Sequence, residues 1–292
     1  MSTLVLQAPA KLNLYLEVLG RRDDGFHELV TVLTVLDLAD ELSLSLRPRD
    51  PALAPGRPDL TLTVSDQGGR PGQVPAGPDN LVVRAAAALL AAAGLTDATG
   101  VDLELVKRIP AGGGLGGGSS DAAATLQGLN RLLGEPLAAA ALSALAADLG
   151  SDVPFFLTGG TALCTGRGEQ VRPLPGPGPV DVSLLLPPFG VATPAVYGAL
   201  RAGPPGAPQR PLSFWESALS GADAETLESI YSNDLEEPAR QVEPRLARLL
   251  ATEGQHLSGS GSTIFAYHGS GARPALIGAE SGLVVHGRCG SR

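Results

Sequence analysis

A run of glycines in the middle of the chain carries the clearest chemical signal. Six of the seven residues from Gly112 to Gly118 are glycine, and the run lies between a strand-like segment at 101–106 and a helix-like segment at 122–133. Glycine lacks a Cβ atom, so its backbone can adopt positive φ and turn N–H groups toward a bound oxygen. The start of a helix adds unpaired N–H groups and a partial positive charge. The sequence therefore predicts a phosphate-binding loop.

Other interpretations of this loop are weaker. The G-x-G-x-x-G spacing at Gly112, Gly114 and Gly117 also fits a Rossmann site. A Rossmann fingerprint belongs to the first βα turn and needs an acidic residue at a strand end about twenty residues on, whereas Glu135 falls in a helix-ending turn. No lysine precedes the loop's hydroxyl residues, which excludes a Walker P-loop, and the H-R-D and D-F-G motifs of protein kinases are absent from the sequence. A flexible loop capped by one of its serines remains the alternative.

Lysine is rare in this chain. Of the 21 basic residues, only Lys11 and Lys107 are lysine, and the two cations are not interchangeable where a compact ammonium must reach one oxygen. Chance codon use is the competing explanation for the scarcity of lysine. Lys11 lies in a strand of alternating apolar residues, where a lone lysine could simply face solvent. Asn13 would share a strand face with Lys11, where it could contact substrate or be only an edge-strand polar residue.

Composition limits the classes of protein. With 292 residues, 43% hydrophobic and 17% charged, the chain should form two globular domains. A net charge of −9 argues against a nucleic-acid partner. The sequence shows neither a long apolar run nor a signal peptide, so we expect a cytoplasmic protein without a membrane partner. Its two cysteines and four histidines have no ligand spacing, and no metal-ligating residue is assigned.

The elements that must position these residues follow from periodicity and turn signals. Strands are predicted at 4–6, 11–19, 29–38, 41–46, 60–64, 101–106, 161–164, 181–186, 263–267 and 283–286. Helices are predicted at 81–93, 122–133, 136–149, 194–200, 212–220, 224–229 and 238–251. Stretches rich in proline and glycine at 48–58 and 68–78 are predicted to be surface loops. Gly159 and Gly160 mark the predicted boundary between a domain of residues 1–160 and one of residues 161–292.

Three separated motifs resemble the GHMP kinase superfamily. They are Ala8-Pro9-Ala10-Lys11-Leu12-Asn13-Leu14, the glycine loop, and Leu257-Ser258-Gly259-Ser260-Gly261-Ser262-Thr263. The segments 23–29, 149–156 and 165–169 narrow the resemblance to the 4-diphosphocytidyl-2-C-methyl-D-erythritol kinases. The resemblance extends from residue 8 to about residue 267.

This resemblance implies an α+β, two-domain GHMP kinase fold. Its N-terminal domain would be ribosomal-protein-S5-domain-2-like, its C-terminal domain a ferredoxin-like α/β sandwich, and its active site the cleft between them. The implied activity is ATP-dependent phosphorylation of the 2-hydroxyl of 4-diphosphocytidyl-2-C-methyl-D-erythritol in the non-mevalonate isoprenoid pathway, with Mg²⁺ accompanying ATP. A homoserine or mevalonate kinase, or a nucleotide-binding regulator without catalysis, is the alternative.

Phosphoryl transfer needs a cradle for the donor, cations for the transferred group and a base or orienting group at the attacking hydroxyl. Lys11 and Asp152 are the catalytic candidates, with Asp152 at the substrate hydroxyl. Asp152 could instead only cap a helix that begins at the following Val153-Pro154.

The resemblance also implies residues that bind the two substrates. Phe26 and Tyr197 would stack on the cytosine, and His27 would pair with its edge, although each could be ordinary packing. Many family members have tyrosine at the Phe26 position, but stacking needs only the face of the ring. The predicted ATP-binding residues are Pro110, Ala111, Gly112, Gly113, Gly114, Leu115, Gly116, Gly117, Gly118, Ser119 and Ser120, together with Asn80, which could be only a helix cap, and Lys107.

Overall fold

The computed structural model describes residues 3–68, 74–268 and 283–290. Its contacts define two compact units, each assembled from separate segments of the chain. The first unit consists of Met1–Pro9, Ala39–Ala111 and Gly117–Leu157, and the second consists of Ala10–Leu38, Gly112–Gly116 and Thr158–Arg292. The domains predicted from the sequence are two continuous ranges, 1–160 and 161–292. This division stays a prediction, because units defined by contacts need not coincide with domains.

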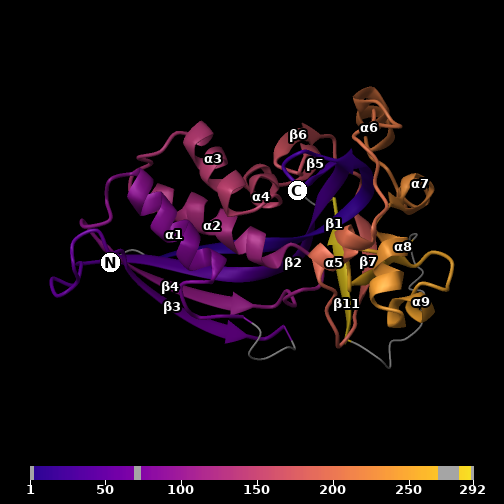
Figure 1. Cartoon of the computed structure of the whole chain (residues 1–292). Coiled ribbons are helices and arrows are strands. Elements are labelled where there is room, and N and C mark those ends of the chain that lie inside the picture. Colours follow the sequence, from indigo (N-terminus) through magenta and orange to yellow (C-terminus); the bar gives the residue numbers. More distant parts are fainter. Residues whose placement is uncertain (1–2, 69–73, 269–282, 291–292) are drawn as a thin grey trace. The chain divides into compact units, whose positions relative to one another are not determined.

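Two long strands run through both units, β1 (Thr3–Arg21) and β2 (His27–Arg47). In the first unit, residues 41–47 of β2 pair antiparallel with β4 (Gly100–Lys107), which pairs parallel with β3 (Asp59–Asp66). Three helices cover one face of these strands: α1 (Leu81–Ala92), α2 (Gly117–Leu132) and α3 (Ala139–Leu149) (Figure 1).

The alternation of β4 decides which side chains enter the core of the first unit. Val101, Leu103 and Leu105 are buried, whereas Glu104 is exposed. Lys107 has the same parity as the three apolar residues, so its side chain continues the buried row. Helix α2 packs closely above: a Cβ atom on Gly128 would lie 2.4 Å from the side chains of both Leu44 and Leu6.

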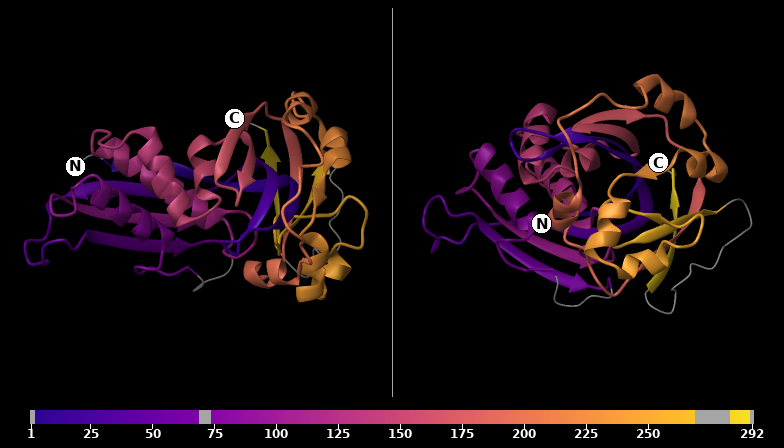
Figure 2. Two further views of the ribbon diagram at one scale, coloured as in Figure 1. Left: turned by 45° about the horizontal axis from the view of Figure 1, so that its top comes forward. Right: turned by 45° about the vertical axis from the view of Figure 1, so that its right-hand side comes forward.

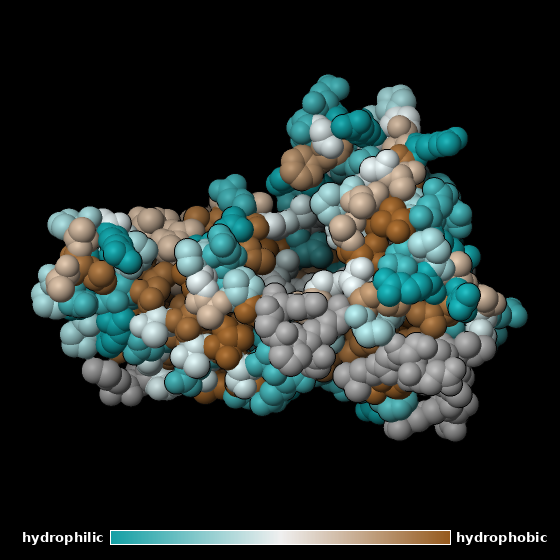
Figure 3. All heavy atoms as spheres, turned by 60° about the horizontal axis from the view of Figure 1, so that its bottom comes forward, coloured by the Kyte–Doolittle hydropathy of each residue, from teal (hydrophilic) through white to brown (hydrophobic). Residues whose placement is uncertain are grey.

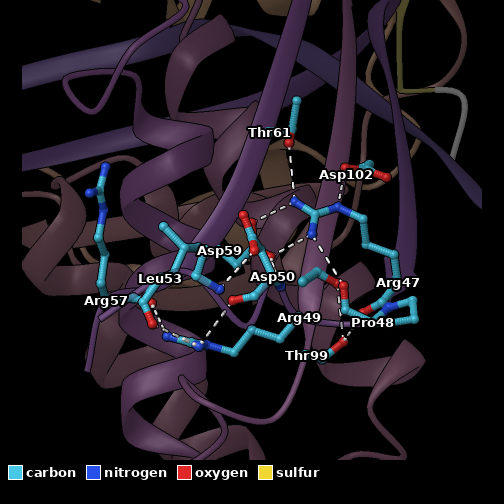
Figure 4. A network of polar contacts seen from close by, with 12 residues as sticks. Arg47, Pro48, Arg49, Asp50, Leu53, Arg57, Asp59, Thr61, Thr99 and Asp102 are labelled. Atoms are coloured by element: carbon cyan, nitrogen blue, oxygen red, sulfur yellow. Dashed lines mark hydrogen bonds and ion pairs between the residues drawn. The ribbon is translucent and has the colours of Figure 1, made fainter. Parts of the chain in front are cut away.

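An arginine organises the proline-rich stretch that follows β2. Arg47 donates two hydrogen bonds to the Asp59 carboxylate, at 2.5 and 2.6 Å, and one to Asp102 at 2.8 Å (Figure 4). Asp59 also accepts a hydrogen bond from the backbone N–H of Asp50, and Arg49 donates to the carbonyl groups of the same loop. Ionic contacts thus hold this predicted surface loop against the sheet.

The second unit contains an antiparallel arrangement in the order β11-β7-β10-β9. The strands are β7 (Val180–Leu186), β9 (His256–Leu257), β10 (Ile264–His268) and β11 (Leu283–Cys289). Three helices lie beside these strands (Figure 2): α5 (Thr193–Ala199), α8 (Glu236–Val242) and α9 (Arg245–Leu249). Buried apolar residues of these helices and strands form one cluster.

The remaining elements extend each unit. In the second unit, β5 (Thr161–Gly166) pairs with residues 29–34 of β2 and with β6 (Gln170–Leu174), and β8 (Ser232–Asn233) pairs with β1. The other helices are α4 (Val153–Thr158), α6 (Leu212–Ala218) and α7 (Ala224–Ile230). Hydrophilic side chains interrupt the hydrophobic ones on the face seen in Figure 3. Among the described residues, the exposed large hydrophobic side chains are Val5, Phe26 and Val242.

The structure corrects several predicted boundaries. Each of the two pairs of early strands, at 4–6 and 11–19 and at 29–38 and 41–46, is one continuous strand. The helix predicted to begin at 122 begins at Gly117, and the one predicted at 238–251 is two helices separated at Pro244. Proline has no backbone N–H to donate and clashes with the preceding turn, so a break there is expected. The short elements β6, β8 and β9 were not predicted, and α4 was considered only as the helix that Asp152 could cap.

Candidate active site

The glycine loop is fixed through its carbonyl groups. The carbonyl oxygen of Gly113 accepts a hydrogen bond from the N–H of Thr263 (3.1 Å), that of Gly114 from the Ser258 hydroxyl (3.0 Å), and that of Leu115 from the N–H of Lys11 (3.0 Å). In the described part of the chain, no hydrogen bond is donated by the backbone N–H groups of residues 112–116. The loop is therefore fixed by hydrogen bonds to its carbonyl groups, and its backbone N–H groups are available to an anion.

Two features require glycine in this loop. Gly112, Gly114 and Gly116 all have positive φ, between 70° and 77°. At Gly114 a Cβ atom would also lie 2.3 Å from the carbonyl oxygen of Ser258 and 2.9 Å from that of Gly261. These contacts lie within the second unit, and a side chain at this position would separate the loop from residues 258–261.

The helix that follows the loop begins earlier than predicted. Because α2 starts at Gly117, residues 117–120 form its first turn, where backbone N–H groups have no partner within the helix. Ser119 and Ser120 therefore lie inside the helix rather than at its N-cap, and the capped-loop alternative is wrong. The Ser120 hydroxyl is buried and has no hydrogen-bond partner among the described residues. The positive end of a helix and an unsatisfied hydroxyl both suit a phosphate group.

Lys11 is buried, contrary to the solvent-facing alternative. Its side chain is 4% exposed, and its Nζ atom donates a hydrogen bond to the side-chain oxygen of Asn13 at 2.5 Å. The Asn13 amide donates to the Thr31 hydroxyl at 2.9 Å, and that hydroxyl donates to the carbonyl oxygen of Tyr15. This chain of donors and acceptors orients the Asn13 amide with its oxygen toward Lys11.

The last glycine-serine loop lies beside Lys11 within the second unit. A Cβ atom on Gly259 would lie 3.2 Å from the Asn13 side-chain oxygen and 3.3 Å from Lys11 Nζ. Asn233 holds this loop by donating to the Gly259 carbonyl oxygen at 2.8 Å. The sequence motif indicated this loop, but the contributions of Thr31 and Asn233 were missed, since they depend on pairing between distant segments.

Asp152 lies in the first unit, between the end of α3 and the start of α4. It is half-buried, and its carboxylate has no hydrogen-bond or ion-pair partner among the residues that the structure describes. Two other side chains do cap helices in the described part of the chain: Asn80 accepts a hydrogen bond from the N–H of Val82, and Asp223 accepts one from the N–H of Thr226. Asp152 makes no such contact, which leaves its oxygens available for a substrate hydroxyl.

Asn80 and Lys107 are both engaged within the first unit. The Asn80 amide caps α1 with its oxygen and donates to the carbonyl oxygen of Pro75 at 2.6 Å. Lys107 Nζ pairs with the carboxylates of Asp40 and Asp121. Their assignment to ATP binding stays a prediction, and the structure adds a structural role for each.

The aromatic candidates form two pairs in the second unit. The Arg167 guanidinium lies over the ring of Phe26, 4.8 Å from its centroid, and Phe26 is half exposed. The rings of His27 and Tyr197 are 5.1 Å apart at 31°. Burial and the nearby charge of Arg21 lower the pKa of His27, so its imidazole is neutral at pH 7 and can both donate and accept. Neither pair contains both predicted stacking rings.

The structure thus brings together Lys11, Asn13 and the glycine-serine loop in one unit, and places Asp152 in the other. The family model described as "GHMP kinases N terminal domain" matches residues 80–160, which include the helix start and Asp152. A solved homoserine kinase from Cytophaga hutchinsonii shares the fold, with a TM-score of 0.66 at 22% identity over 93% of this chain and 86% of that one. The predicted α+β GHMP kinase fold is confirmed, and with it the class of small-molecule kinases.

More similar proteins define the family within this class. The 4-diphosphocytidyl-2-C-methyl-D-erythritol kinase of Shouchella clausii is 39% identical over 266 residues, covering 89% of this chain and 84% of the relative. The crystal structure of a 4-(cytidine 5'-diphospho)-2C-methyl-D-erythritol kinase is also similar, at 38% sequence identity and a TM-score of 0.72 over 99% of this chain and all of that one. The chain belongs to the 4-diphosphocytidyl-2-C-methyl-D-erythritol kinase family, as predicted.

This membership supports ATP-dependent phosphorylation in isoprenoid synthesis, the main function predicted from the sequence. Of the described helices, none combines the length and apolarity needed to cross a lipid bilayer.

Proposed function

We propose that this chain transfers a phosphoryl group from ATP to the 2-hydroxyl of 4-diphosphocytidyl-2-C-methyl-D-erythritol. Besides family membership, one observation carries the proposal: the carbonyl groups of residues 113–115 accept hydrogen bonds, while the N–H groups of residues 112–116 have no partner among the described residues. Such a loop followed by a helix start binds phosphate without needing a basic surface. A net charge of −9 is compatible with this kind of local anion site.

The reaction requires one proton transfer and one phosphoryl transfer. The Asp152 carboxylate accepts the proton of the 2-hydroxyl, and the hydroxyl oxygen forms a bond to the γ-phosphorus of ATP. The bond between this phosphorus and the β–γ bridging oxygen breaks, and ADP leaves with that oxygen. Asp152 then releases the proton to water. The carboxylate suits this task because it has no internal partner in the described part of the chain.

Lys11 stabilises negative charge on the transferred group. Its ammonium is buried and oriented by Asn13, so little reorganisation is needed when charge develops. The Asn13 oxygen fixes the ammonium, and Asn13 would also contact the substrate. The hydroxyl of Ser120 would donate to a phosphate oxygen and so gain the partner that it lacks among the described residues.

Magnesium bound with ATP would supply positive charge that offsets the charge of the phosphates. In such sites the ion is held largely by substrate phosphates and by one or two protein oxygens. The Ser120 hydroxyl, which is buried without a hydrogen-bond partner among the described residues, is an oxygen that suits such a site.

The aromatic pairs would recognise the cytidine. Phe26 has one face covered by Arg167, so its other face is the one on which a base can stack. The neutral His27 would read the cytosine edge, and Tyr197 would complete the pocket. Because the donor is ATP, we expect the protein to act in the cytoplasm.

An ADP-release assay with four acceptors tests this proposal. The purified chain, ATP and Mg²⁺ are incubated with the cytidine substrate, its uridine analogue, homoserine or mevalonate. We expect rapid ADP release with the cytidine substrate, a large loss with the uridine analogue, and background rates with the other two. Turnover of homoserine or mevalonate would identify another GHMP kinase, and ATP binding without any turnover would indicate a regulator. Equal use of cytidine and uridine would refute the role of His27.

A further inference from the structure

Three charged side chains meet in the core of the first unit. Lys107 is at the end of β4, Asp40 lies in β2, and Asp121 lies in α2. The Nζ atom of Lys107 hydrogen-bonds to both carboxylates, at 2.7 Å from Asp121 and closely to Asp40. All three residues are at most 3% exposed. We call these residues the Lys107 cluster.

The cluster contacts the chain on both sides of the glycine loop. On the preceding side, one Asp40 oxygen accepts hydrogen bonds from the backbone N–H groups of Arg108 (2.5 Å) and Ile109 (2.8 Å). On the following side, a Cβ atom on Gly117 would lie 3.0 Å from Lys107 Nζ. The two segments that lead into and out of the loop are thus bound to the same three charges.

The three side chains of the Lys107 cluster depend on one another, because all of them are buried and charged groups need partners there. Burial alone would lower the pKa of Lys107, but the Asp121 and Asp40 carboxylates outweigh it and raise that pKa, so the ammonium stays charged. Removing any member leaves the others in the core with an unmatched charge or hydrogen-bonding group. The Lys107 side chain is buried, and two of its three N–H donors are directed at carboxylates of the same unit. Its charge is therefore already paired within the protein.

We propose that the Lys107 cluster is a positioning device for the phosphate loop, and that Lys107 acts on ATP binding through this device without contacting the nucleotide. The inference rests on the proposed function of the glycine loop. It gives Asp40 and Asp121, which the sequence motifs did not indicate, a role in nucleotide binding.

Asp40→Asn distinguishes positioning from direct charge contact. Removing a carboxylate near bound phosphates should tighten ATP binding if charge alone mattered. If the cluster positions the loop, the same change weakens ATP binding, roughly tenfold or more, because small misplacements are costly at a phosphate site. Calorimetry with Mg·ATP measures the affinity, and adenosine, which lacks phosphates, serves as the control ligand whose affinity should hardly change.

Lys107→Met and a neighbouring control complete the experiment. We expect Lys107→Met to weaken ATP binding as Asp40→Asn does, and Arg108→Met, which removes a partly exposed cation paired with Glu41, to leave it within about twofold. Without ATP, hydrogen exchange at the Arg108 and Ile109 amides should accelerate in Lys107→Met but not in Arg108→Met. If Asp40→Asn does not fold, Asp121→Asn replaces it and should not bind ATP more tightly than the wild type.

Tighter ATP binding in either Asp→Asn variant, or unchanged amide exchange in Lys107→Met, would overturn the proposal. These measurements use ATP binding and exchange only. They therefore test the positioning role of the Lys107 cluster even if the protein does not turn over the cytidine substrate.

Discussion

Two single residues carry the chemistry, and each can be compared with a residue of the same type that is fixed in an ion pair. Asp152 has no partner among the described residues, whereas the carboxylates of Asp40, Asp59 and Asp121 are engaged in ion pairs. Lys11 is the lysine whose ammonium is held by a neutral amide oxygen. An available carboxylate and a buried, oriented ammonium are the two groups that a hydroxyl nucleophile and a phosphoryl group need.

Asp152→Asn tests the role of the carboxylate. An amide keeps the shape but cannot accept the hydroxyl proton, so we expect kcat to fall roughly 10²- to 10⁴-fold with little change in ATP affinity. Steady-state kinetics and calorimetry measure the two effects. Asp148→Asn is the matched control, because Asp148 is an exposed aspartate four residues earlier, on α3. A kcat near that of the wild type would remove Asp152 from the reaction.

Lys11→Arg tests whether size matters as well as charge. The ammonium is 2.5 Å from the Asn13 oxygen, and the Gly259 backbone is close enough that a Cβ atom there would lie 3.3 Å from the ammonium. The planar guanidinium keeps the charge but cannot take the same position, so we expect roughly a tenfold loss or more in kcat, about 1.4 kcal/mol at the transition state. Lys11→Met, which removes the charge, should lose more. If the arginine variant had normal kcat, the lysine would be needed only as a cation.

At the scale of elements, the glycine loop depends on close backbone packing. Gly112 and Gly114 have similar positive φ, but only Gly114 has carbonyl oxygens where a Cβ atom would lie; none of the atoms described around Gly112 is within 4 Å of that position. Both alanine variants bear the backbone cost of a left-handed residue, roughly 1–2 kcal/mol. We expect Gly114→Ala to lower the melting temperature by several degrees more than Gly112→Ala. Equal shifts in thermal unfolding without ligand would contradict the packing described here.

The same loop shows how much of the site could be predicted. The residue types and their order indicated a phosphate loop, and the family motifs indicated Lys11 and Asp152. The helix start was missed by five residues because glycine and serine have low helix propensity, and tertiary contacts override it. The partners of Lys107 could not be predicted, since they come from segments 67 and 14 residues away.

Other errors have different physical causes. The break at Pro244 was readable from the missing N–H of proline, so the single helix predicted there was an avoidable error. Helix α4 has only six residues, too few for a helical period to show in the sequence. The long strands β1 and β2 were each divided in two because short breaks in their alternating pattern look like ends.

At the scale of the whole molecule, stability should depend on pH through the buried Asp121. Burial raises the pKa of Asp121 to about 7 from its ordinary value of 3.8, Lys107 lowers it, and Asp40 raises it further. A carboxyl group whose pKa is higher in the folded state contributes stability that is complete below pH 3.8 and is lost as the pH rises through 7. The Lys107 cluster should therefore weaken between pH 5 and pH 8.

Thermal unfolding of the wild type and Asp121→Asn from pH 5 to pH 8 measures this dependence. The asparagine does not titrate, so the melting temperature of the wild type should fall relative to the variant as the pH rises, by roughly a few degrees. Effects of the other titrating groups cancel in the difference. A constant difference, or one that grows in favour of the wild type, would contradict this titration.

The central claim is that the whole molecule moves the γ-phosphoryl group of ATP to one particular hydroxyl. The 2-carbon of the acceptor bears a methyl group and no hydrogen, so a phosphate placed there has no proton on the attached carbon. Phosphorus NMR of the product tests this directly. We expect a new phosphomonoester signal without three-bond coupling to a proton, together with an intact diphosphate and an equal amount of ADP. A phosphomonoester signal split by neighbouring protons would place the phosphate on another hydroxyl and contradict transfer to the 2-hydroxyl.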